Sequence, residues 1–101
     1  MNSPNQLLML SIPPALSDNL VDWLLENKNA GGFTSANAWG HSGDTHRYNI
    51  TEQVTGRQKR VQFQLAGDVD AIQTLLKQLK QHFIQTGIHY WIIPILEEGQ
   101  L

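Results

Sequence analysis

The sequence predicts an α+β fold in which four strands and two helices follow one another in the order β-α-β-β-α-β. Three observations lead to this prediction: two segments repeat apolar residues with a helical period, four short segments are apolar or alternate strictly, and they succeed one another in this order. A chain of 101 residues holds one hydrophobic core, so we expect a single domain over residues 1–101.

The first strand and the first helix are predicted between residues 7 and 29. Residues 7–12 form a nearly continuous apolar run that two prolines close, which is typical of a buried strand. A helix that Pro14 can open follows, because apolar side chains recur on one helical face at Leu16, Leu20, Trp23 and Leu24. The glycines near residue 31 end it.

Two further strands are predicted on either side of a long polar segment. Residues 33–39 alternate and are rich in Thr, Phe and Trp, and residues 57–66 place apolar Val61, Phe63 and Leu65 opposite polar neighbours. The segment from Gly40 to about Thr55 is polar, contains glycine and has no sustained period. A compact domain rarely carries such a loop without a use, so we expect it to be functional.

The second helix and the last strand complete the fold. Asp68 is a candidate N-cap, one apolar stripe follows it, and Gly87 stands where a left-handed residue ends a helix. Residues 88–96 are apolar on both alternating faces, and Pro94 favours an edge strand. This order predicts a ferredoxin-like sandwich, a four-stranded antiparallel sheet with two helices on one face.

The second face of that sheet should need a cover. Two helices cover only one face, while the neighbouring first and fourth strands carry large apolar residues on both. Leu7 and Met9 would share this face with Trp91, Ile93 and Ile95, or with the residues that alternate with these three. Together they would expose on the order of several hundred Å² of apolar surface, and its burial is worth roughly 25 cal/mol per Å². We therefore expect a homo-oligomer; the alternative is that the C-terminal segment or the long loop folds back over the sheet.

Composition narrows the classes of function. With seven Lys and Arg against nine Asp and Glu, the net charge of −2 argues against nucleic acid as a partner. The absence of cysteine and of a long apolar run favours the cytoplasm without membrane insertion. No nucleophile beside a base, paired carboxylates or cofactor glycine motif is visible, so we expect a protein that is not an enzyme.

Three stretches, GFTSANAWGH, EQVTGRQKRVQF and QTGIHYWIIPILEEGQL, resemble the PII-like family of small bacterial proteins related to nitrogen regulators, over nearly the whole chain. The resemblance implies a signal-transducing trimer with inward-facing sheets, whose loop between strands two and three docks on a regulated protein. Members of the family and the similarly folded CutA proteins are linked with heavy-metal tolerance and efflux. A transporter is therefore a candidate for the regulated protein, and the alternative function is a cytoplasmic metal-binding accessory protein linked to heavy-metal efflux or tolerance.

The resemblance also implies where a small effector would bind. In PII proteins a nucleotide lies between subunits, at the loop base and at a glycine-rich phosphate loop; the counterparts here are Gly40 with His41, and Thr86 with Gly87. The sequence departs from that pattern, since Gly87 is followed by IHYW with no further glycine or lysine to cradle phosphates. The departure argues against ATP and leaves the effector unassigned.

Two clusters suggest chemistry near the long loop. Arg57 and Arg60, with Lys59 between them, can hold a carboxylate or phosphate, or can form a charged surface that pairs with Glu52 or with tail carboxylates of a neighbour. His41, Asp44 and His46 are ligand types that suit a divalent metal, but most such clusters are only solvated loop. The sequence leaves open whether the first cluster is an anion site or a charged surface, and whether the second is a metal site or a solvated loop.

Overall fold

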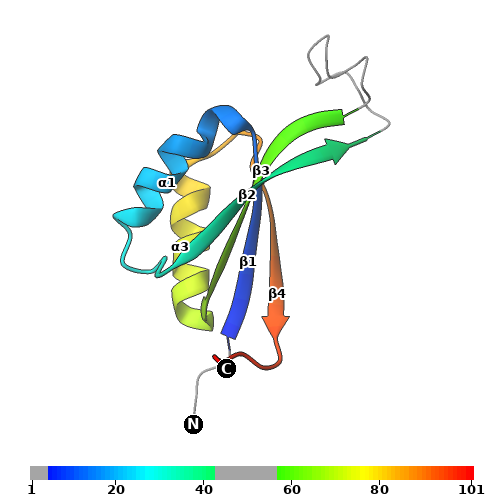
Figure 1. Cartoon of the computed structure of the whole chain (residues 1–101). Coiled ribbons are helices and arrows are strands. Elements are labelled where there is room, and N and C mark those ends of the chain that lie inside the picture. Colours follow the sequence, from blue (N-terminus) through cyan, green and yellow to red (C-terminus); the bar gives the residue numbers. More distant parts are fainter. Residues whose placement is uncertain (1–4, 43–56) are drawn as a thin grey trace.

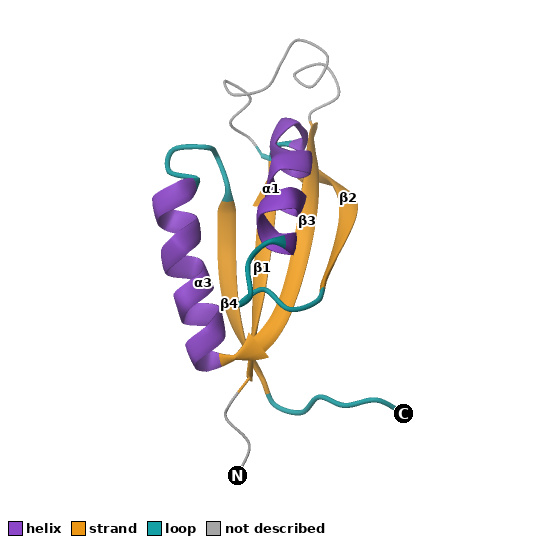
Figure 2. Cartoon of the chain, turned by 90° about the vertical axis from the view of Figure 1, so that its left-hand side faces the viewer, coloured by secondary structure: helices purple, strands orange, loops and turns teal. Residues whose placement is uncertain are grey.

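The computed structural model describes residues 5–42 and 57–101, and it confirms the predicted sheet with two helices on one face (Figures 1 and 2). In chain order the elements are β1 (Asn5–Ile12), a 3-10 turn (Pro14–Leu16), α1 (Ser17–Leu25), β2 (Phe33–His41), β3 (Arg57–Asp68), α3 (Val69–His82) and β4 (His89–Ile95). The antiparallel sheet has the order β2-β3-β1-β4, so β2 and β4 are its edges. The edge position of β4 accommodates Pro94, as its sequence indicates.

The core lies between the sheet and the helices, and the strand register decides which side chains enter it. Leu8 lies opposite both Leu65 and Ile92, and Leu10 lies opposite both Phe63 and Tyr90. Paired residues share a face of the sheet, so alternate residues of β1 and β3 point to the helices. These buried strand residues are Leu8, Leu10, Ile12, Val61, Phe63 and Leu65.

Each helix contributes an apolar stripe to this core. The prolines open a 3-10 turn before α1, and α1 then buries Leu20 and Leu24. The Asp68 carboxylate accepts a hydrogen bond from the Ala71 N–H at 2.8 Å, which confirms the predicted N-cap of α3. Residues Ile72, Leu75, Leu76 and Leu79 of α3 are buried. Neither helix in the described part of the chain has the length and hydropathy needed to span a bilayer.

The other face of the sheet, which we call the open face, has neither described helix over it (Figure 1). Register places Leu7 beside Ile93 and Met9 beside Trp91 on this face. Trp91 is 44% exposed and Ile93 is 39% exposed. The C-terminal segment does not fold back over them, because it runs away from the sheet with Leu96 99% exposed (Figure 2). The apolar surface expected from the sequence is therefore present in the single chain.

Several element boundaries differ from the sequence prediction. Strand β2 continues through Gly40 and His41, which were predicted to lie in the long loop, because they pair with Gln58 and Arg57 of β3. Strand β3 continues to Asp68 because β1 itself begins at Asn5 and pairs along this length. The remainder of the predicted loop, from residue 43 to residue 55, lies outside the described residues.

Candidate ligand site at the base of the long loop

Arg60 is the centre of the candidate site. It lies on β3 opposite Ala38, and its side chain reaches across the open face. Its Nε donates to the Ser11 hydroxyl at 3.0 Å, and its Nη2 donates to the carbonyl oxygens of Ser11 at 2.6 Å and Gly87 at 2.9 Å. One guanidinium therefore connects β3, the end of β1 and the turn that leads into β4.

Two glycines shape the surroundings of Arg60. A Cβ at Gly40 would lie 3.3 Å from Cγ of Arg60, closer than ordinary van der Waals contact, so glycine lets the arginine stem lie against β2. Gly87 has φ of 82°, a left-handed conformation that side chains disfavour, and its carbonyl accepts from Arg60. The structure thus brings together Gly40, Arg60 and Gly87, which were predicted as ligand-binding residues from distant parts of the sequence.

The charge of Arg60 persists in this position. Desolvation by partial burial lowers the pKa of its guanidinium from the ordinary value. An arginine nevertheless stays protonated at neutral pH, because its ordinary pKa lies far above neutral pH. Nε and Nη2 are occupied by Ser11 and Gly87, while Nη1 makes no hydrogen bond with the described residues. Its two N–H donors are therefore available to an anion.

A second cationic cluster lies on the opposite face of the same two strands. The guanidinium carbon of Arg57 is 4.1 Å from the centre of the Trp39 ring, and the ammonium of Lys59 is 5.9 Å from it. Trp39 is 46% exposed, so it is not a core residue of the single chain. A hollow of about 330 Å³ lies against this end of the strands, lined by Pro14, Asn37, Ala38, Trp39, Lys59 and Arg60.

Of the other predicted site residues, Thr86 and His41 lie within the described part of the chain. Thr86 belongs to the helix end, because its hydroxyl donates to the Phe83 carbonyl at 2.6 Å and closes the turn after α3. His41 is exposed at the end of β2 and lies opposite Arg57. Asp44 and His46, the other two residues of the predicted metal site, lie outside the described residues. Within the described ranges, no three His, Asp or Glu side chains gather as a metal site would require.

Sequence reasoning missed Ser11 as a member of this site. Ser11 is 49 residues from Arg60 in the sequence and belongs to no charged motif, so no local spacing connects the two residues. The available signal was indirect: a polar residue near the end of an otherwise apolar strand indicates a polar neighbour on the same face. Arg60 supplies that neighbour.

The fold is a small α+β architecture that PII-like and CutA proteins share. A candidate PII-like signalling protein from Thermus thermophilus has a TM-score of 0.66 at 13% identity, with 92% of this chain and 88% of that chain covered. The divalent cation tolerance protein CutA from Archaeoglobus fulgidus has a TM-score of 0.70 at 11% identity, covering 95% and 88%. At these identities the likeness shows the fold alone.

Residues 2–101 match the family described as protein of unknown function DUF3240, and the chain belongs to that family. A crystal structure of a DUF3240 family protein from Shewanella baltica is 27% identical, with a TM-score of 0.76, and covers 100% of this chain and 99% of that chain. No curated protein sequence matches the chain.

Proposed function

We propose that this chain is a PII-like regulatory protein, without catalytic activity, that binds a small anionic effector between the subunits of a homo-oligomer. The observation that carries the proposal is the position of Arg60, which stands next to the uncovered apolar surface and at the base of the long loop. A ligand held there touches both the subunit contact and the loop.

The first step of the argument is that the open face favours association with another copy. Trp91 and Ile93 expose apolar surface beside Leu7 and Met9, and burial of such surface stabilises association by roughly 25 cal/mol per Å². A self-complementary sheet face is buried most simply against the same face of another copy. The resemblance of the sequence to PII-like proteins implies a trimer as the closed assembly.

The second step is that the apolar strip leads directly to Arg60. On the open face, Met9 is followed by Ser11 on β1, and Gln64 is followed by Gln62 and Arg60 on β3. Arg60 therefore stands two side-chain repeats beyond the apolar strip, and its side chain reaches back to Ser11, which is one repeat beyond it. A neighbouring copy that covers the strip borders Arg60, so that this partly buried cation lies in a cleft between subunits.

The third step connects the cleft to a partner protein. Strand β2 ends at His41, one residue after Gly40, and β3 begins at Arg57, three residues before Arg60. The segment proposed to dock connects these two strand ends. An anion that binds Nη1 of Arg60 pulls on the same guanidinium group that holds Ser11 and Gly87 through Nε and Nη2, so it can shift this group and change the geometry of the loop base. We propose that this change controls engagement of a regulated protein, for which a transporter is a candidate. The absence of cysteine supports a cytoplasmic site of action.

Analytical ultracentrifugation tests the assembly. The wild type should sediment as an oligomer at micromolar concentration, and Trp91→Glu on the open face should shift it toward the monomer. Leu25→Glu is a matched control, because Leu25 is 70% exposed on α1 and carries the same change on the helix side. A wild-type monomer at these concentrations contradicts the shared cleft.

Deletion of residues 43–49 and the variant Arg60→Met test the regulatory part. Both proteins should remain oligomers; the deletion should abolish capture of the partner from a bacterial lysate, and Arg60→Met should abolish protection by phosphate or citrate in a thermal-shift titration. If the deletion leaves capture intact, the loop is not the docking element.

A metal-binding accessory protein that uses His41, Asp44 and His46 is the second candidate, supported by the CutA-like fold. Arg57 lies opposite His41 and Lys59 follows on the same face, and the described residues bring no group of three metal ligands together at His41. Equilibrium titration with Zn²⁺ of the wild type and of the double variant His41→Ala, His46→Ala separates the two functions. Equal uptake by both proteins rejects the metal site.

A further inference from the structure

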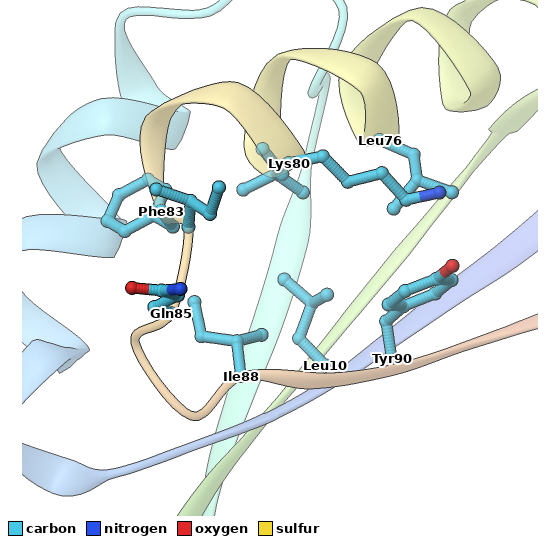
Figure 3. Close-up of a pocket in the computed structure, with 9 residues that line it drawn as sticks. Leu10, Leu76, Lys80, Phe83, Gln85, Ile88 and Tyr90 are labelled. Atoms are coloured by element: carbon cyan, nitrogen blue, oxygen red, sulfur yellow. The ribbon is translucent and has the colours of Figure 1, made fainter.

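A groove on the helix side of the sheet has no part in the site described above. Helix α3 contacts β1 and β3 and lies at the edge of the sheet that β4 forms (Figure 2). Between them lies a cavity of about 340 Å³ (Figure 3). It is lined by Leu10, Leu76, Leu79, Lys80, Phe83, Ile84, Gln85, Ile88 and Tyr90. This volume lies at the small end of the range for sites that bind organic molecules.

The floor of the groove is rigid and apolar. Leu10 is 1% exposed, Leu79 is 5% exposed and Leu76 is 7% exposed, because all three belong to the central core. The groove cannot close without repacking this core, so it is formed before any ligand arrives. Its rim leaves apolar surface in water, with Ile84 70% exposed and Tyr90 40% exposed. An apolar group that enters the groove therefore gains burial against both floor and rim.

The mouth of the groove carries one positive charge. The Lys80 ammonium lies 5.2 Å from the centre of the Tyr90 ring, and Figure 3 shows the lysine side chain extended over the groove with its nitrogen above that ring. None of the lining residues is acidic. The C-terminal end of α3 contributes about half a negative charge, which is smaller than the full charge of Lys80. The mouth therefore favours a negatively charged group.

The opposite end of the groove is polar and locally fixed. Gln85 has φ of 57°, a left-handed conformation that costs a residue other than glycine about 1 kcal/mol or more. The Thr86 hydroxyl bonded to the Phe83 carbonyl holds this turn. Figure 3 shows the Gln85 amide at the end of the groove away from the Lys80 nitrogen and the Tyr90 hydroxyl, with Leu10 and Ile88 between them. Along the groove, the Lys80 charge is therefore followed by the apolar floor and then by the Gln85 amide.

We propose that this groove binds a small amphipathic carboxylate, a short alkyl or aryl acid whose apolar part lies on Leu10 and Ile88 and whose carboxylate pairs with Lys80. The proposal does not depend on the effector site at Arg60, because the two sites lie on opposite faces of the sheet. A small acid explains the apolar floor and the isolated cation together. A neutral apolar ligand explains only the floor, and a second copy of the chain is tested below as an alternative occupant.

Amide chemical shifts measured by NMR during titration with octanoate, octylammonium and octanol test the proposal on the full chain. Octanoate should shift amides of residues 79–90 at millimolar concentration, and octylammonium should bind at least tenfold more weakly. Lys80→Met should weaken octanoate binding roughly tenfold, as expected for loss of one partly exposed charge-assisted hydrogen bond, and should leave octanol unchanged. Lys77→Met, an exposed lysine on the same helix, should have no effect.

The rim supplies a second pair of variants. Ile84→Glu should abolish octanoate binding, whereas Leu25→Glu should retain it; both residues are 70% exposed, so neither change disturbs the core. Equal binding of octanoate and octylammonium overturns the assigned charge. Octanoate shifts confined to residues of the open face overturn the location. Shifts in residues 79–90 that depend on protein concentration and not on octanoate show that a second copy occupies the groove, which also overturns the proposal.

Discussion

Replacement of Arg60 by methionine should destabilise the protein by about 2–3 kcal/mol. The guanidinium makes three hydrogen bonds of 2.6–3.0 Å to Ser11 and Gly87. A hydrogen bond from a charged donor is worth about 1.5–3 kcal/mol when it is buried. Two of the bonds share Nη2 and the bond to Gly87 is exposed, so we count about two effective bonds at the low end of that range. Methionine retains much of the apolar stem, so lost packing adds little.

Urea unfolding at one fixed protein concentration measures this loss, because association of copies makes stability depend on concentration. Lys77→Met is the control for the lost charge and should change the free energy of unfolding by less than about 0.5 kcal/mol. A double-mutant cycle of Arg60→Met with Ser11→Ala should give a coupling of about 1 kcal/mol, since Ser11 contributes one of the bonds through its side chain. If Arg60→Met behaves like Lys77→Met and the coupling is zero, Arg60 does not hold these strands together.

Two further changes test local features of the fold. Asp68→Ala removes the hydrogen bond that caps α3 and should lower the free energy of unfolding by about 1 kcal/mol, whereas Asp70→Ala, in the same helical turn without a cap bond, should cost less; urea unfolding compares them. Gly87→Ala should cost about 1 kcal/mol or more because φ is 82°, whereas Gly32→Ala meets open space at an ordinary φ and should be close to neutral in thermal unfolding.

The sequence predicted the fold well because each element carries its own periodicity. Alternation in residues 57–66 and the apolar stripe after Asp68 depend only on local spacing, and the structure confirms both. The end of β2 was predicted too early, because Gly40 and His41 read as loop residues and become strand only through pairing with β3. Local propensity cannot report a partner strand that lies beyond a long intervening segment.

The candidate site was predicted less completely. Arg60 and Gly87 were singled out for different reasons, and their contact across 27 residues depends on the three-dimensional turn of the chain. Trp39 is 46% exposed and lies against Arg57, which comes near it only because β2 pairs with β3. The groove between α3 and β4 has no sequence signature, because residues of β1, α3, the turn after α3 and β4 form it together.

The central position of β1 has a consequence for how the molecule assembles during synthesis. Its residues pair with residues 61–68 on one side and residues 89–95 on the other, although β1 itself is made first. Leu8 and Leu10 therefore emerge from the ribosome long before any strand that can pair with them, and contacts so far apart in sequence close slowly. Nascent chains should consequently depend on holding chaperones until the last strand is released.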